Sequence, residues 1–192
     1  MAREGWCPIA TSNGGDGSAT ELEFTNIPNT YEHLCLRGLV SSSSSDSFPI
    51  YYFMTFNSNN TGYDVSELGN GYAGGTKVVY SNLNGTAGPT KGRHVNPTVG
   101  NAGNSTTHGA LGYGYFEAEV FNYKNTSAYT SVNIASGYAT QNTSGGTLRT
   151  QVRNGHFVWR NTAAVTSIKF QWENSAAWLT DSKVTLYGFL GE

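Results

Sequence analysis

Alternation of apolar and polar residues with a period of two is the feature that most restricts the fold of this chain. It is clearest over residues 165–173, where apolar Ile168, Phe170 and Trp172 alternate with polar neighbours. Successive side chains of a strand point to opposite faces, so this pattern predicts a strand with one buried face. Similar patterns predict strands over 21–25, 31–40, 49–57, 76–80, 112–122, 129–135, 148–152, 155–159 and 182–190, with a further candidate at 93–95.

Many short strands separated by turn residues, without an amphipathic helix, predict an all-β protein built as an antiparallel sandwich or barrel. Residues 1–19 are rich in Gly and Ser after an apolar patch at Trp6, and we interpret them as an N-terminal arm. Residues 20–192 are interpreted as a single domain. Within it, the polar stretches 58–75 and 82–107 predict long loops rich in Gly, Ser and Asn.

Composition narrows the function classes. Aromatic residues make up 13% of the 192 residues and the net charge is −2, a combination that favours folding over disorder. The 11 basic residues are scattered, so a nucleic-acid partner is not expected, and no apolar run predicts a membrane span. Residues 1–17 lack a signal-peptide pattern, so secretion by that route is not expected either. Five glycosylation sequons are therefore interpreted as by-products of composition: Asn59, Asn84, Asn104, Asn125 and Asn142.

Cysteines and histidines do not form a recognisable metal motif. Cys7 and Cys35 have no partner at metal-site spacing, and we predict two free thiols with Cys35 packed as a small hydrophobic residue. The four histidines are interpreted as isolated side chains: His33, His94, His108 and His156. We predict neither a metal nor another cofactor.

Glu117 and Glu119 are the carboxylates that most resemble a catalytic pair. Residues two apart share one face of a strand, and a retaining glycosidase needs two carboxyl groups about 5–5.5 Å apart. Residues 113–119 are also similar to one strand of the concanavalin-like β-glucanases, but the E-x-D-x-x-E pattern of those enzymes is absent. Nucleophile-elbow, Walker and dinucleotide-binding motifs are absent too. We interpret the glutamates as a solvent-facing pair and predict no catalytic residue.

Aromatic and basic residues offer two weaker binding hypotheses. Exposed tryptophans can stack on sugar rings; Trp172 is in register with core residues, whereas Trp178 is the better candidate for exposure. Trp159 is the third tryptophan of the C-terminal half that this hypothesis includes. Acidic groups could be recognised by three arginines on neighbouring strands, which could equally make local or intersubunit contacts: Arg149, Arg153 and Arg160.

Three segments carry a resemblance to a known class of proteins. They are FTNIPNTYEHLCLRG at 24–38, WRNTAAVTSI at 159–168 and SKVTLYGF at 182–189. Their order and spacing resemble those of small virion structural proteins of tailed bacteriophages. The resemblance frames the chain from residue 24 to 189, while the middle is only loosely similar.

The resemblance implies a jelly-roll-like sandwich that acts as a capsid cement or decoration protein, commonly a homotrimer. Such a protein binds the major capsid protein on the outer shell and stabilises contacts between capsomers, without enzymatic activity. It would be part of a virion assembled in the host cytoplasm, with the 1–19 arm reaching a partner. The alternative is a tail-fibre or receptor-binding domain that contacts tail proteins and recognises a host surface glycan. A glycan-depolymerising enzyme is a third hypothesis, and the fold alone does not choose among them.

Overall fold

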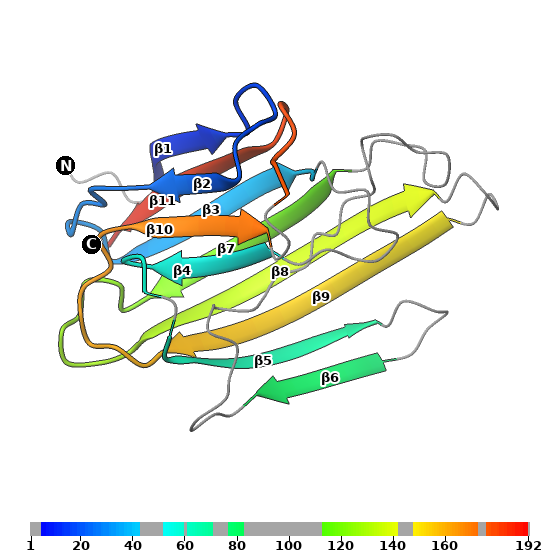
Figure 1. Ribbon diagram of the computed structural model, residues 1–192. Helices are drawn as coiled ribbons and strands as arrows, with labels where there is room; N and C mark the ends of the chain where they lie inside the picture. The colour runs from blue at the N-terminus through cyan, green and yellow to red at the C-terminus, as the bar shows by residue number, and fades with distance from the viewer. Residues whose placement is uncertain are drawn as a thin grey trace.

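A computed structural model describes residues 5–42, 52–59, 61–70, 77–82, 113–141, 148–172 and 176–191. These residues form two antiparallel sheets, one of eight strands and one of three (Figure 1). The eight-stranded sheet has the order β1-β11-β3-β7-β8-β9-β5-β6 and the three-stranded sheet the order β2-β10-β4. The strands are β1 (Gly5–Asn13), β2 (Glu21–Phe24), β3 (His33–Val40), β4 (Tyr52–Phe56), β5 (Tyr63–Asn70), β6 (Lys77–Asn82), β7 (Gly114–Phe121), β8 (Thr130–Gln141), β9 (Leu148–Trp159), β10 (Ile168–Trp172) and β11 (Lys183–Leu190).

The predicted all-β, antiparallel fold is confirmed. The jelly-roll connectivity implied by the resemblance stays a prediction. Among the described residues no helix has the length and hydropathy needed to cross a bilayer.

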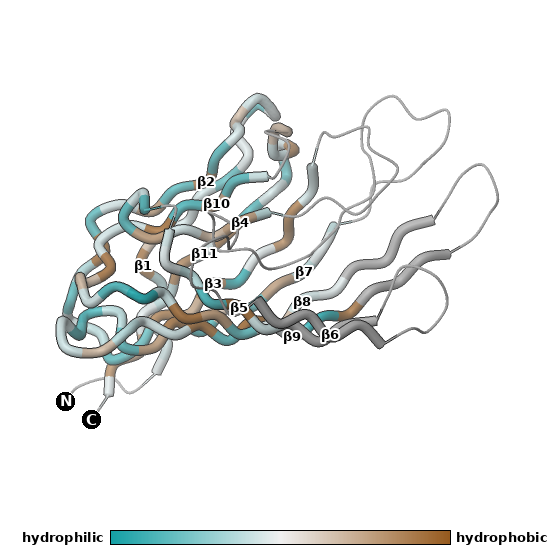
Figure 2. Tube along the Cα trace, turned by 60° about the horizontal axis from the view of Figure 1, so that its bottom comes forward, coloured by the Kyte–Doolittle hydropathy of each residue, from teal (hydrophilic) through white to brown (hydrophobic). Residues whose placement is uncertain are grey.

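The small sheet packs on one face of the large sheet, over β11, β3 and β7 (Figure 1). We call this the inner face. Figure 2 shows no described segment over the opposite side, the outer face. As far as the described residues go, the large sheet therefore has one covered and one open face, and strands that alternate apolar and polar side chains suit that arrangement.

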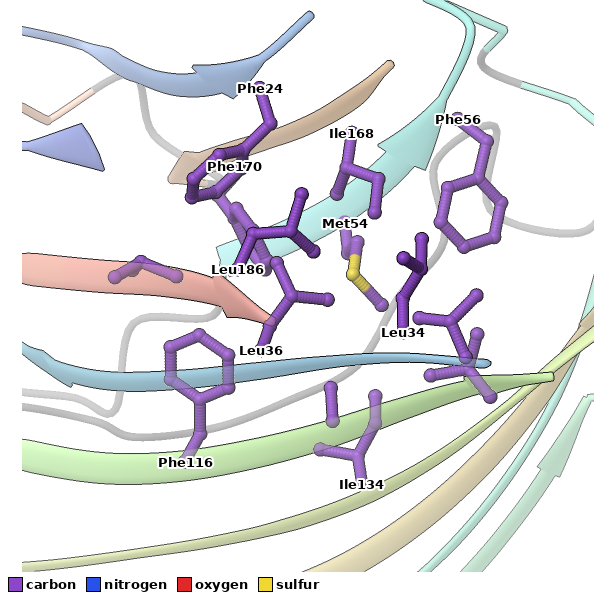
Figure 3. Packing of buried hydrophobic residues seen from close by; sticks show 14 of the residues in the cluster. Phe24, Leu34, Leu36, Met54, Phe56, Phe116, Ile134, Ile168, Phe170 and Leu186 are labelled. Atoms are coloured by element: carbon purple, nitrogen blue, oxygen red, sulfur yellow. The ribbon is translucent and has the colours of Figure 1, made fainter. Parts of the chain in front are cut away.

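Side chains from both sheets meet in the core (Figure 3). Phe170 of β10 lies against Phe116 of β7, with ring centroids 5.5 Å apart. Tyr52 of β4 contacts both rings and also packs edge-on against Trp172. All four side chains are at most 1% exposed. Burial of each such side chain contributes about 1.5–3 kcal/mol, so this cluster is the main attachment between the sheets.

The structure corrects the interpretation of the first residues as an N-terminal arm. Residues 5–13 are not a loose lead-in but form β1, which pairs with β11 from Gly5↔Leu190 to Asn13↔Lys183. The register shifts between Pro8 and Ala10, and Ile9 packs partly against the core. An edge strand buries few side chains, and Pro8 and Gly5 weaken its strand signal further, so the pattern in the sequence is faint.

The predicted loop 58–75 is wrong in part, because it contains β5. Tyr63 and Val65 are buried, and β5 pairs with β9 on one side and β6 on the other. Only these two core residues signal the strand, and the glycines that follow obscure it. The predicted strands 148–152 and 155–159 are one strand, β9, in which Gly155 lies opposite Ile134 of β8.

Several predictions lie outside the described residues. These are the strand at 93–95, the loop from residue 83 onward, His94, His108 and the sequons at Asn84, Asn104 and Asn142.

Candidate functional site on the outer face

The outer face is organised in rows of side chains that run across neighbouring strands. Antiparallel pairing places one residue of each strand directly opposite one of the next, with side chains on the same face. At the end of the sheet nearest the chain termini, one row is aromatic. We name as the aromatic row Trp6 of β1, Phe189 of β11, His33 of β3 and Phe121 of β7.

The rings of the aromatic row contact each other in sequence. Trp6 and Phe189 have ring centroids 5.3 Å apart, and His33 lies 6.5 Å from Phe189 and 5.0 Å from Phe121. The ring of Trp6 is 37% exposed although its size suits it to burial. The other three rings are partly exposed. The outer face therefore presents a line of four rings across four strands.

A second, apolar row lies toward the other end of these strands. Leu39 of β3 is opposite Tyr115 of β7, and Tyr115 is opposite Gly137, which is in turn opposite Val152 of β9. Leu39, Tyr115 and Val152 are 55%, 44% and 61% exposed. Glycine in the middle of this row leaves the surface low over β8.

Between the two rows, the face is hollowed over β7, β8 and β9. The hollow has a volume of about 560 Å³. Ala135 lies between Glu117 and Asn154 in the register, so a methyl group separates two longer side chains. The lining residues are Tyr115, Glu117, Glu119, Asn133, Ile134, Ala135, Asn154 and Gly155.

Glu117 is the most highly hydrogen-bonded side chain of the hollow. Arg37 of β3 donates from Nε to Oε2 at 3.1 Å and from Nη2 to Oε1 at 3.3 Å. The Tyr115 hydroxyl donates to Oε2 at 2.6 Å. The Tyr115 hydrogen bond first, and then Arg37, hold the pKa of Glu117 below its ordinary value. The same hydrogen bond raises the pKa of Tyr115 to about 12.

This environment determines what the glutamate pair can do. Glu117 and Glu119 share the outer face and are partly exposed, so the predicted solvent-facing pair is confirmed. A retaining glycosidase needs one of two carboxyl groups to be protonated as a general acid. The surroundings of Glu117 favour its ionised form, and they suit it to accepting hydrogen bonds rather than to donating a proton.

The three tryptophans of the C-terminal half do not form the exposed platform for sugar stacking that the sequence suggested. Trp172 lies in the core, as predicted, and Trp159 is buried as well. The predicted exposure of Trp178 is wrong, because this residue is fully buried and its ring centroid lies 4.5 Å from that of Trp172. A β-bridge between Trp178 and Ser42 ties its loop to the end of β3. That long-range contact has no signal in the local sequence.

The two arginines whose side chains the structure describes, Arg153 and Arg160, are not brought together as one anion site. Arg153 is buried on the inner face, opposite Ser136 of β8. Arg160 pairs with Asp64, with 3.3 Å between Nε and Oδ2. Arg149 is in β9, but its side chain lies outside the described part of the structure.

The two cysteines lie on the strands that flank β11. Cys7 is opposite Gly188 and Cys35 is opposite Tyr187, so a whole strand separates them. Two strand spacings amount to roughly 9–10 Å, beyond the roughly 6.8 Å that a disulfide allows between Cα atoms. Both are free, and Cys35 is buried as predicted. In the described part of the chain, no three His, Cys, Asp or Glu side chains gather as a metal site.

The sequence pointed to Glu117 and Glu119 but missed Asn133, Ala135 and Asn154, which complete the hollow. Their positions follow from the register of β7, β8 and β9, which only the folded sheet defines. Comparison with family models, with curated proteins and with solved structures finds no match.

Proposed function

We propose that this chain is a structural protein of a tailed-bacteriophage particle, a capsid cement or decoration protein that binds the outer shell through its aromatic row. The observation that carries the proposal is the line of Trp6, Phe189, His33 and Phe121 on a sheet face that no described segment covers. Aromatic side chains are enriched at protein interfaces, and tryptophan is prominent among the residues that dominate binding energy. The jelly-roll connectivity and the trimer implied by the resemblance belong to this proposal.

The placement of the resembling segments supports it. Segments 24–38 and 159–168 are joined by a hydrogen bond from the Ile27 N–H to the Thr166 carbonyl, 3.0 Å long. Segments 24–38 and 182–189 are joined by one from the Glu32 N–H to the Phe189 carbonyl, 2.8 Å long. His33 and Phe189 of the aromatic row come from these same segments. Two of the three resembling segments thus contribute side chains to the aromatic row.

The described side chains of the outer face supply aromatic rings and hydrogen-bonding groups, which suit a binding surface. The carboxylate of Glu117 is held in its ionised form by Tyr115 and Arg37. A cement protein acts by adding interface area between neighbouring capsomers and needs no reactive group.

The proposal is tested by adding the purified chain to particles that lack it. Bound protein is measured by co-sedimentation and quantitative gel staining, and its position by electron microscopy of the particle. We expect tens to hundreds of copies on the head, and a loss of affinity of at least tenfold for Trp6→Ala. Tyr129→Ala is the matched control, because Tyr129 is 50% exposed and lies outside the aromatic row.

Tyr129→Ala changes a half-exposed side chain and should unfold at nearly the temperature of the parent chain. Trp6→Ala also loses its packing on Phe189, so binding is compared at a temperature where circular dichroism shows both variants folded. Unchanged occupancy for Trp6→Ala contradicts binding through the aromatic row. A few copies at the tail tip contradict the cement role and favour the receptor-binding alternative.

A further inference from the structure

We propose that the hollow over β7, β8 and β9 is a carbohydrate-binding site for a neutral sugar. The ligand's hydroxyl groups would bond to Glu117, Glu119, Asn133 and Asn154, with Tyr115 as the side wall. The inference goes beyond attachment to a particle and is tested on the isolated chain. Phe121 of the aromatic row neighbours Glu119 on β7, whereas Trp6, the residue varied for particle binding, lies three strands from the hollow. Trp6 is on β1, and β11 and β3 lie between β1 and β7, which is the nearest strand of the hollow.

The hollow is an open depression of the sheet surface, and its size allows a small ligand. Its volume of about 560 Å³ lies within the roughly 300–1,000 Å³ typical of small-molecule sites. It opens on the face that no described segment covers, so a longer chain of sugar units could extend from it (Figure 2). Its floor is formed by small groups, the methyl group of Ala135 and the backbone at Gly155. A flat ring can therefore approach the sheet closely.

The polar groups of the hollow match a polyhydroxylated ligand. Asn133 and Asn154 each carry a donor and an acceptor, and both side chains are exposed. Glu119 and Glu117 supply carboxylate acceptors, which make the stronger, charge-assisted kind of hydrogen bond with hydroxyl donors. Sugar hydroxyl groups both donate and accept, so they can bond to Asn133, Asn154 and Glu119. They can also bond to the one acceptor position that Arg37 and Tyr115 leave on Oε1 of Glu117.

Two of the groups are held in place before any ligand binds. Arg37 fixes both oxygens of Glu117, and the Tyr115 hydroxyl bonds to the same carboxylate at 2.6 Å. The ring of Tyr115 is thereby tied at the rim, and the residue is 44% exposed. A side wall that is already ordered loses less conformational entropy on binding. An aromatic ring in this position can pack against the C–H face of a sugar.

The charge of the hollow selects against anionic sugars. None of the described residues that line it is basic, and the guanidinium of Arg37 already serves Glu117. A uronate or sialylated ligand would bring its carboxylate close to Glu119, and contact between two like charges is unfavourable. Arg37 offsets the charge of Glu117, which leaves Glu119 as the one charged lining residue without an ion pair among the described residues. A cationic probe therefore decides whether that charge selects a basic sugar.

The test is a titration of the purified chain with oligosaccharides, followed by backbone amide NMR. The probes are maltohexaose, cellohexaose and mannohexaose, with trigalacturonate as the anionic probe and a chitosan hexamer as the cationic one. We expect at least one neutral hexasaccharide to bind with a Kd on the order of 1 mM and to shift the amides of Glu119, Asn133 and Asn154. Trigalacturonate should leave these amides unchanged.

Substitutions of the lining residues then test whether the sugar binds in the hollow. Asn154→Ala and Tyr115→Ala should each raise the Kd at least tenfold. Tyr115→Phe keeps the ring and should raise the Kd by a smaller factor. Ala135→Leu fills the floor from an exposed position and should block binding without lowering the unfolding temperature. Tyr129→Ala is the matched control and should bind as the parent chain does.

Three results would overturn the proposal. The first is that no neutral hexasaccharide saturates the chain up to its solubility limit. The second is that binding survives Ala135→Leu, which would place the sugar elsewhere. The third is that only the chitosan hexamer binds, which would make the hollow a site for basic groups. Each result is obtained on the isolated chain and is independent of particle occupancy.

Discussion

Arg37 and Glu117 face each other across β3 and β7, and the guanidinium donates to both carboxylate oxygens at 3.1 and 3.3 Å. The pair joins two central strands on the open face of the sheet. The pair also fixes the position of the Glu117 carboxylate, which lines the hollow.

Arg37→Met should lower the free energy of unfolding at neutral pH by about 0.5–1 kcal/mol, since both partners are partly exposed. The pKa of Glu117 lies below its ordinary value of 4.5 in the folded chain. The contribution of the ion pair is therefore complete above the unfolded-state pKa and is lost as the pH falls through the lower folded-state pKa. Urea denaturation at neutral pH and at about pH 2 measures the difference. A destabilisation that is equal at both pH values would show that the charge of Glu117 is not its cause.

Tyr63→Phe should cost about 1–3 kcal/mol, because it leaves two backbone groups without a partner. The Phe56 N–H donates to the Tyr63 hydroxyl at 2.8 Å, and the hydroxyl donates to the Asn59 carbonyl at 3.0 Å. Tyr63 belongs to the large sheet and Phe56 to the small one, so the hydroxyl joins the sheets. Denaturant unfolding is the measurement. The control is Tyr129→Phe on an exposed ring, and an equally small effect for both substitutions contradicts the prediction.

Gly188→Ala should destabilise the chain by about 1–3 kcal/mol through overpacking. A Cβ at this position would lie 2.2 Å from Cγ of Tyr31, whose ring covers the strand there. The same substitution in a Tyr31→Ala background should cost less, because the obstructing ring is gone. A double-mutant cycle of unfolding free energies measures the coupling. Additive effects of the two substitutions would show that the ring and the glycine do not interact.

Cys7 should react with a thiol reagent in the folded chain, and Cys35 only after unfolding. Burial, followed by the charge of Glu117, raises the pKa of Cys35 to about 11, while Cys7 is half-buried on the edge strand. The thiolate is the reactive form, so a raised pKa and burial both slow Cys35. Colorimetric titration with a disulfide reagent at mildly alkaline pH should show a single accessible thiol. Cys7→Ser should remove that phase, and a fast phase that persists would assign it to Cys35.

The strands that could be predicted from the sequence are those whose own residues bury a full face. Ile168, Phe170 and Trp172 are an example, since each is buried and the intervening residues are not. The alternation is local, so the pattern is visible without knowing what it packs against. The same reasoning correctly placed Glu117 and Glu119 on one solvent-facing side of a strand.

The predictions that failed concern residues whose environment is made by distant parts of the chain. β1 is a strand because β11, more than 170 residues later, offers a free edge. Trp178 is buried because Trp172, Tyr52 and the end of β3 surround its loop. Local polarity suggested an open loop in both cases, and neither segment alone holds the information that overrides it.

The sequence by itself therefore determined that this chain is all-β, and which face is buried in strands with a clear alternation such as β7 and β10. The tertiary structure alone decided the order of the eight strands, and with it the aromatic row and the hollow between Glu117 and Asn154. The physical reason is that alternation along a strand depends only on neighbouring residues. A row or a hollow across strands depends on register, and register is set by pairings between segments far apart in the chain.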